Sequence, residues 1–189
     1  MSAEASAPDL RAALRDRYGE RARLSESFGE LTAEVGPELW PDLAAFARDR
    51  LGMTFFDWLT GVDEPPDRIA VVAHVYDIAG RRRLLLRTTV DRGAPRLASL
   101  TGVYRGADWH ERETYEMFGV IFDGHPDLRP LLLPDGFEGH PLRKDFVLAA
   151  RVAKPWPGAK EPGESGRATA RRRRPLPPGV PPDWGTPED

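Results

Sequence analysis

The stretch Arg68–Val90, RIAVVAHVYDIAGRRRLLLRTTV, decides the fold of this chain. Its first part alternates between two sets of side chains, one of which is Ile69, Val71, Ala73 and Val75. After a turn signal at Ala79-Gly80, the alternation resumes with Leu84, Leu86 and Thr88 in one set. A period of two predicts β-strands over 68–76 and 83–90. Because the connection between them is turn-sized, an antiparallel hairpin is favoured over a parallel crossover.

The rest of the domain is predicted from weaker patterns on both sides of this hairpin. Apolar residues at helical spacing predict two helices, over Asp9–Tyr18 and Pro37–Arg50. Alternating or apolar runs predict three further strands, over Leu31–Val35, Met53–Leu59 and Ala98–Val103. Strands joined by turns, with helices beside them, predict an α+β fold, a mainly antiparallel sheet with two or three helices packed on it.

Composition excludes several classes of protein. The 189 residues contain no cysteine, so we expect no disulfide, thiolate zinc site or cysteine-ligated iron–sulfur cluster in this chain. No apolar run approaches the ~20 residues of a membrane-spanning helix, and the N-terminus lacks the pattern of a signal peptide. The net charge of −3 argues against nucleic acid as a partner. A soluble, intracellular chain is expected.

The C-terminal residues differ in composition from the rest. Residues 151–189 carry eight Lys and Arg against five Asp and Glu, a net charge of +3, and hold nine of the 19 prolines. Dense, non-periodic proline removes backbone donors, so we predict a Pro/Arg-rich extended tail. The expected organisation is an N-terminal segment over 1–36, an α+β domain over 37–150 and the tail over 151–189.

The block Asp108–Phe146, DWHERETYEMFGVIFDGHPDLRPLLLPDGFEGHPLRKDF, concentrates charged residues, aromatic residues and turn formers. Asp108 and Glu111 have the spacing of a capping box, which predicts a helix from about Trp109 to Phe118 that stops at Gly119. Arg112 and Glu116 are four residues apart and are expected to pair on one helix face. The helix is therefore either a plain surface helix, in which such a pair adds about a few tenths of a kcal/mol, or part of an interface.

Two His-Pro steps shape the segment after this helix. Proline restricts its own φ and that of the preceding residue, so HPDLRP and GHPLRKDF are predicted to be rigid loops rather than helix. The apolar run Leu131–Leu133 is expected to anchor the loop to a core. Long loops with packed anchors of their own more often have a function than serve only as connections.

The block contains no recognisable catalytic pattern. His110, His125 and His140 lie 15 residues apart, which is not a common metal-ligand spacing, and two of them precede proline. Glu111 and Glu113 are two apart on a helix, so they point in different directions and do not flank one substrate bond. No G-x-S-x-G elbow is present. Arg171–Arg174 is better explained as a solvated tail than as a site for RNA or anionic lipid.

The segments ERETYEMFGVIF, GHPDLRPLLLP and EGHPLRKDF resemble the signature of the 30 kDa subunit, also called the C subunit, of respiratory complex I. The resemblance is close over 106–146 and looser back to about residue 39. Three positions depart from the family pattern. Glu116 stands where aspartate is usual, Pro130 where a second arginine is common, and Gly136-Phe137 where an acidic-aromatic pair is common.

The resemblance implies a non-redox subunit in the peripheral arm of a membrane-associated, proton-translocating NADH–quinone oxidoreductase. It implies that no cofactor is bound by this chain, while FMN, iron–sulfur clusters and quinone lie in partner subunits. The implied partners are the subunit that shapes the quinone site and the subunit that carries the terminal cluster. The implied location is the cytoplasmic face of the bacterial cell membrane, reached only through the complex.

Nine residues of the block are expected to shape the loop or to contact partner subunits. They are Glu111, Arg112, Glu113, His125, Asp127, Arg129, His140, Arg143 and Asp145. Arginine forks among them suit paired carboxylates on a partner. Two alternatives remain open: the equivalent subunit of a related membrane hydrogenase or deazaflavin-dependent quinone reductase, and a free-standing enzyme that uses the His and Glu residues.

Overall fold

The computed structural model of the chain describes residues 9–147. Five strands form a sheet in the order β1-β2-β5-β4-β3. They are β1 (Ala22–Ser27), β2 (Glu30–Val35), β3 (Phe55–Glu64), β4 (Arg68–Asp77) and β5 (Arg82–Asp91). The pair β2 and β5 runs parallel and the other three pairs run antiparallel, so the sheet is mixed. The α+β class and the mainly antiparallel sheet are confirmed.

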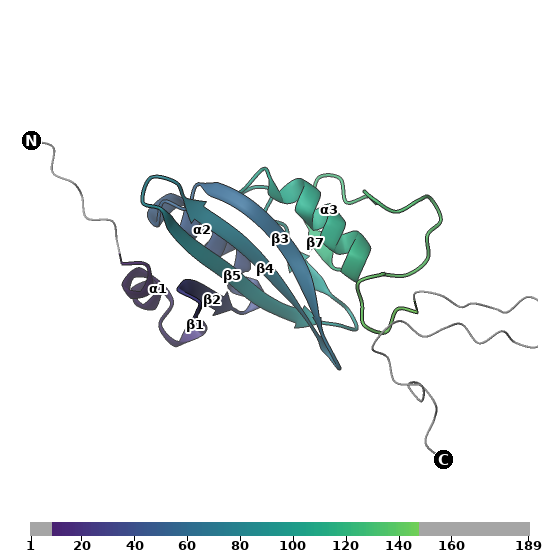
Figure 1. The fold of residues 1–189 in the computed structure, drawn as a ribbon, viewed down its shortest axis with the longest axis horizontal. Helices are drawn as coiled ribbons and strands as arrows, with labels where there is room; N and C mark the ends of the chain where they lie inside the picture. The colour runs from purple at the N-terminus through teal and green to yellow at the C-terminus, as the bar shows by residue number, and fades with distance from the viewer. Residues whose placement is uncertain (1–8, 148–189) are drawn as a thin grey trace, which may run out of the picture. The chain divides into compact units, whose positions relative to one another are not determined.

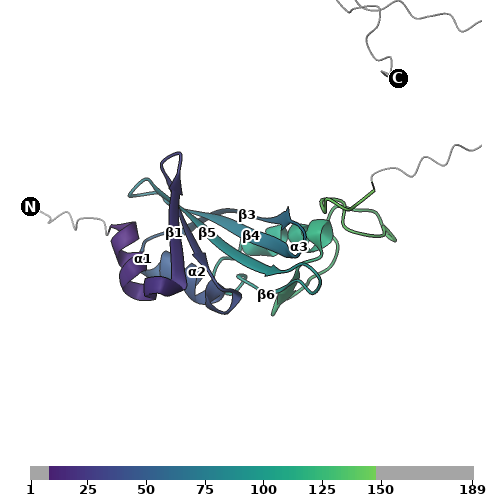
Figure 2. The same cartoon turned by 90° about the horizontal axis from the view of Figure 1, so that it is seen from below.

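Three helices accompany this sheet: α1 (Leu10–Tyr18), α2 (Trp40–Arg50) and α3 (Ala107–Phe118). Short 3₁₀ turns, Gly19–Arg21 and Pro37–Leu39, follow α1 and precede α2. Two short strands, β6 (Arg96–Ala98) and β7 (Ile121–Asp123), pair in parallel on either side of α3 in the sequence. Seen from below, α1 and α2 lie toward the β1–β2 end of the sheet and α3 lies toward the other end (Figure 2).

The predicted hairpin is β4 and β5, paired from Arg68↔Asp91 to Asp77↔Arg82. The set Ile69, Val71, Ala73 and Val75 is fully buried, as are Leu84 and Leu86. They pack against Trp40, Leu43, Ala44 and Ala47 of α2, which the helical spacing placed on one face. Each large aliphatic side chain buried in this way stabilises the fold by about 1.5–3 kcal/mol.

The N-terminal residues share this core. Leu14 and Tyr18 of α1 and Ala33 and Val35 of β2 are buried in the same apolar cluster as the hairpin. The predicted boundary after residue 36 therefore separates segments that pack together. The predicted helix over Asp9–Tyr18 is confirmed, with the Asp9 carboxylate accepting from the Arg11 amide at its start. The predicted tail over 151–189 lies outside the described residues.

Two predicted elements differ in the structure. The strand expected over Ala98–Val103 is wrong: β6 ends at Ala98, and the chain then turns so that Leu100 is buried. β3 continues beyond Leu59 to Glu64 through Gly61, where a Cβ would lie 2.6 Å from the ring of Phe118. Glycine at this position therefore allows α3 to pack closely on the strand.

No helix among residues 9–147 is both long enough and apolar enough to cross a membrane. After α3 and β7, the chain continues without regular structure from Gly124 to Val147, a segment we call the α3 loop. It extends beside α3, on the side of the sheet away from α1 (Figure 1). Most of the charged block found in the sequence lies in α3 and in this loop.

Candidate functional site

The α3 loop is fastened to the C-terminal end of α3. A helix leaves its last four carbonyls without partners inside the helix. Here all four accept hydrogen bonds from groups beyond the helix. The pairs are Gly119 N to Tyr115 O at 2.8 Å, His140 Nδ1 to Glu116 O at 2.9 Å, Leu142 N to Met117 O at 3.2 Å and Arg143 Nε to Phe118 O at 2.6 Å. The loop thus serves as the cap of the helix.

Gly119 makes this approach possible. Its φ of +77° lies in the left-handed region that favours glycine, as the sequence predicted for the helix stop. A Cβ at this position would lie 2.5 Å from His140 Nε2 and 2.8 Å from Arg143 Nη2. The absence of a side chain therefore allows both capping residues to reach the helix end.

The carboxylate of Glu116 holds the middle of the loop. It is almost fully buried and accepts from three consecutive amides, Leu131 at 3.2 Å, Leu132 at 2.8 Å and Leu133 at 2.8 Å. Bonds to an ionised acceptor are stronger than bonds between neutral groups. The expectation that these leucines anchor the loop through a core is wrong, because Leu132 is 60% exposed and the backbone makes the anchor.

Arg112 holds the preceding turn of the loop. Its Nε donates to Arg129 O at 3.1 Å and its Nη2 to Pro130 O at 2.9 Å, while the guanidinium lies 5.7 Å from the centre of the Trp109 ring. The predicted pair of Arg112 with Glu116 is therefore wrong. Both side chains reach across to the loop instead, where each satisfies backbone groups that have no secondary-structure partner.

His125 fixes the start of the loop. Its Nδ1 accepts from the Asp127 amide at 3.0 Å, so its Nε2 carries the proton and donates to Asp108 O at 3.2 Å. The imidazole is fully buried. Asp127 pairs outward with Arg129 at 2.9 Å, and both side chains are more than half exposed. Such a surface pair contributes about 0–1 kcal/mol, so Asp127 and Arg129 matter little for the fold itself.

The far end of the loop is fastened to the sheet. The carboxylate of Asp63 on β3 accepts from the Lys144 amide at 2.7 Å and from Arg92 Nε at 2.8 Å. Arg92 also pairs with Asp145 at 2.8 Å. The hydrogen bond from Arg92 holds the pKa of the nearly buried Asp63 below its usual value. Both ends of the loop are thus attached to regular structure.

Glu111 faces inward and belongs to the core. Its two oxygens accept from Ser99 Oγ and from the Leu100 amide, each at 2.6 Å, and the side chain is fully buried. Burial raises the pKa of Glu111 to about 7. The predicted capping box is wrong, because α3 begins at Ala107 and no side chain caps it. Glu111 instead holds the turn after β6. Glu113 is half-buried, with no hydrogen bond or ion pair to residues 9–147.

The three histidines of the block make contacts at three different places and do not form a cluster. The His110 ring packs edge-on against Phe56 with 5.6 Å between ring centres, whereas His125 and His140 each bond to a different backbone carbonyl. Within the described part of the chain, no three His, Asp or Glu side chains are grouped as a metal ion would require. His125 and His140 shape the loop, whereas His110 packs α3 against β3.

Large apolar side chains are exposed on α3 and its loop, as they are at several other places in the described residues. Besides Val147 at the end of the loop, four large hydrophobic side chains of α3 and its loop are more than 40% exposed: Trp109, Leu132, Phe137 and Leu142. Exposed apolar residues are common singly, whereas contiguous apolar patches are typical of interaction sites. We refer to these four side chains together as the loop surface.

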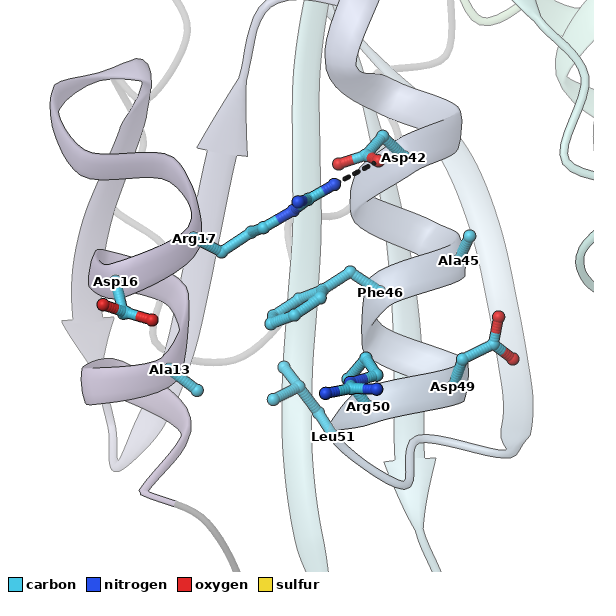
Figure 3. A pocket seen from close by; sticks show the side chains of 9 residues that line it. All are labelled: Ala13, Asp16, Arg17, Asp42, Ala45, Phe46, Asp49, Arg50 and Leu51. Carbon is cyan, nitrogen blue, oxygen red and sulfur yellow. Dashed lines mark hydrogen bonds and ion pairs between the residues drawn. The ribbon is translucent and has the colours of Figure 1, made fainter.

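Another hollow lies away from the loop, between α1 and α2. It is an open groove of about 750 Å³ that contains the Arg17–Asp42 ion pair, 2.9 Å long, above the Phe46 ring (Figure 3). Asp42 also accepts from the Tyr18 hydroxyl at 2.7 Å, and this bond lowers the pKa of Asp42. These contacts join α1 to α2, so their role is structural.

Sequence reasoning identified the loop but missed three residues that hold it. Glu116, Asp63 and Arg92 form the anchors described above, and Asp63 and Arg92 are 29 residues apart in the chain. A buried aspartate in a strand is the signal that was available, because a buried carboxylate requires donors. The donors that pair with this aspartate depend on how the loop returns to the sheet. No local sequence pattern indicates the path of that return.

Comparison with known proteins gives a consistent result. Residues 33–152 match the family model described as respiratory-chain NADH dehydrogenase, 30 Kd subunit. The C subunit of the NADH-quinone oxidoreductase of Roseiflexus sp. (strain RS-1) is 46% identical over 147 residues, covering 75% of this chain and 82% of the relative. The C subunit of the same enzyme in Sinorhizobium medicae (strain WSM419) is 42% identical over 149 residues, covering 76% and 74%.

Two solved structures share the fold. A trypsin-resistant fragment of Nqo5 superposes with a TM-score of 0.57 at 27% identity, covering 63% of this chain and 98% of the fragment. A chain of an archaeal membrane-bound sulfane sulfur reductase has a TM-score of 0.67 at 20% identity, covering 82% and 94%, and this likeness concerns the fold alone. With the matched family model spanning α3 and its loop, the chain belongs to the family of the 30 kDa subunit of respiratory-chain NADH dehydrogenase.

Proposed function

We propose that this chain is a docking subunit, without a redox centre of its own, of a membrane-associated and proton-translocating NADH–quinone oxidoreductase. It sits in the peripheral arm at the cytoplasmic face of the bacterial cell membrane and reaches the membrane only through the complex. FMN, the iron–sulfur clusters and quinone are held by other chains. Its contribution to electron transfer from NADH to quinone is to hold the quinone-site and terminal-cluster subunits in position.

One observation carries this proposal. The α3 loop has no regular secondary structure, yet its backbone is bonded to α3 at one side and to Asp63 on the sheet at the other, while the loop surface stays exposed. A loop already held in one shape loses little conformational freedom when it binds, which preserves affinity. The side chains available for contact include the four of the loop surface together with Glu113, Asp127 and Arg129.

The other predicted site residues act behind this surface. Arg112, His125, His140 and Arg143 bond to backbone groups within the chain, and Asp145 pairs with Arg92. We propose that these residues shape the loop and do not contact the partner subunit directly. The names of the relatives favour the NADH–quinone enzyme over a membrane hydrogenase or a deazaflavin-dependent reductase. Isolating the chain from membranes and identifying its companion subunits separates these candidates.

A pair of matched substitutions tests the docking role. Leu142→Asp places a charge on the loop surface, and Ile78→Asp places one on the turn after β4, at side chains that are 54% and 62% exposed. Because an unpaired charge at an interface core is costly, Leu142→Asp is expected to reduce the assembled complex strongly and Ile78→Asp much less. Native gels and NADH–quinone activity of membranes measure this. Normal assembly of Leu142→Asp, with both purified chains folded, would contradict the proposal.

A further inference from the structure

A small pocket lies between the last turn of α3 and the α3 loop. Its volume is about 220 Å³, and its walls include Tyr115, Pro130, Pro134, Asp135 and Phe137. Sites for small organic ligands usually measure about 300–1,000 Å³, so this pocket fits a single side chain better than a free metabolite. Pockets of this kind, filled by one anchoring residue of the partner, supply much of the energy of protein interfaces.

The shape of the pocket is fixed before any partner arrives. Glu116, one of its lining residues, holds the Leu133 amide at 2.8 Å, and the carbonyl of Glu116 binds His140 at 2.9 Å. The Phe137 amide donates to Pro134 O at 3.1 Å, which closes the turn that forms the outer wall. The Phe137 ring is supported from behind by Phe146, with 5.9 Å between the ring centres.

The carboxylates among the side chains that line the pocket are not balanced by a lysine or arginine in the lining. Two of its lining residues, Glu116 and Asp135, carry carboxylates, and none is a lysine or an arginine. The carbonyls of the last turn of α3 are already satisfied, one of them by the Arg143 guanidinium, so the end of the helix adds no free negative charge. The Glu116 carboxylate is saturated by three amides, whereas Asp135 is exposed and makes no hydrogen bond or ion pair to any residue between 9 and 147.

The remaining walls suit the same kind of occupant. Tyr115 and Phe137 present aromatic rings, whose faces attract cations, and Pro130, Pro134 and Leu133 present apolar surface. Lysine and arginine side chains combine an apolar stem with a charged end and so match both features. An acidic side chain would meet like charge, and an apolar one would leave the Asp135 carboxylate desolvated without a partner.

We propose that this pocket receives a basic side chain, an arginine or a lysine, of the subunit on which the α3 loop docks. The proposal rests on the proposed function, since it names the chemistry of the partner at the same surface. The Asp135 carboxylate forms the ion pair, the two rings flank the cation, and the prolines pack on its stem. The side chain enters from the exposed side of the loop, where Phe137 and Asp135 lie.

Substitutions of Asp135 in the full chain, expressed in place of the native subunit, test the charge. Asp135→Lys is expected to lower the amount of assembled complex at least about tenfold, because it opposes like charges, while Asp135→Glu stays within about twofold. Asp67→Lys, on the exposed turn before β4, is the matched control for a charge reversal and should assemble normally. Normal assembly of Asp135→Lys would overturn the proposal.

The occupant is identified by photo-crosslinking in the intact complex. With Phe137→p-benzoylphenylalanine, the crosslinked partner peptide is expected to contain an arginine or lysine at the attachment site. A peptide without a basic residue, or no crosslink to any subunit, would overturn the proposal. If Leu142→Asp blocks assembly while Asp135→Lys does not, the docking role stands and only the basic occupant fails. If neither substitution affects assembly, the docking role fails as well.

Discussion

At the scale of single residues, the block that looked like a surface strip divides into residues that face inward and residues that face outward. The Glu111 carboxylate lies among core side chains and accepts two hydrogen bonds. The Glu116 carboxylate accepts hydrogen bonds from three backbone amides. Both carboxylates were predicted to act on the helix surface. Burying a carboxylate is costly unless donors surround it, and each of these two side chains has its donors in a segment outside α3.

The titration of Glu111 should be visible in the stability of the chain. Burial raises its pKa from 4.5 to about 7, so between these values the folded state holds a proton that the unfolded chain has released. The contribution of Glu111 is therefore most favourable below pH 4.5 and is lost as the pH rises to about 7. Above that pH, the cost of the buried charge is on the order of 3 kcal/mol.

Replacing Glu111 by its neutral counterpart should remove this dependence. Glu111→Gln keeps the shape and retains an acceptor for the Leu100 amide, so we expect it to match the wild type near pH 5 and to exceed it in free energy of unfolding at about pH 8. Urea titrations of the purified full chain at the two pH values measure the difference. Glu113→Gln, a charge removal on the same helix, is the control. An equal gain for Glu111→Gln at both pH values would contradict the assigned burial.

At the scale of elements, α3 and its loop form one unit. The helix end needs four donors, and the loop supplies three of them from His140, Leu142 and Arg143. The loop in turn has few hydrogen bonds of its own and depends on α3 for its shape. Destabilising one should therefore release the other, although they are separated by β7 in the chain.

Two glycines with positive φ allow this coupling to be measured. Gly119→Ala and Gly124→Ala both place a Cβ in the left-handed region, at φ of +77° and +83°, which costs about 1–2 kcal/mol. Only at Gly119 would the Cβ meet His140 and Arg143, so Gly119→Ala should cost about 1–3 kcal/mol more. Urea denaturation gives both values, and limited proteolysis should cut the α3 loop faster in Gly119→Ala. Equal losses at the two positions would show that the capping contacts contribute little.

The elements that could be predicted from sequence are those whose side chains alternate between core and solvent. The β4–β5 hairpin and α2 fall in this class, because burial on one face imposes a period on the residues. β1 was missed because Ala22–Ser27 is an edge strand with most of its side chains exposed, so no apolar period marks it. The strand expected at Ala98–Val103 failed because its apolar residues fill the core from a turn held by Glu111.

The candidate site could be located from sequence but its internal contacts could not. Density of proline and charge marked the α3 loop, and the resemblance named its family. Arg112 and Glu116 have ideal spacing for a helix pair, yet the unpaired backbone groups of the loop bind both side chains more effectively. Such competition between a local pair and a distant loop is decided by tertiary structure, and local spacing carries no information about it.

At the scale of the whole molecule, the sheet and α3 act as a frame that presents one loop. Asp63 at the end of β3 and Glu116 in α3 hold the loop at two points, and the loop surface lies between and beyond them. Residues 1–150 carry a net charge of −6, and the pocket beside Phe137 is lined by two carboxylates without a lysine or arginine. The account therefore predicts a partner surface that is basic around an apolar centre.

The most direct test of the docking surface compares the free chain with the assembled complex. Carbene or hydroxyl-radical labelling of the full chain reports the exposure of individual side chains in each state. We predict that Leu132, Phe137 and Leu142 are labelled strongly in the free chain and fall to near background in the complex. Phe28, fully exposed at the turn between β1 and β2, serves as the reference side chain. Unchanged labelling of all three loop residues in an active complex would contradict the account.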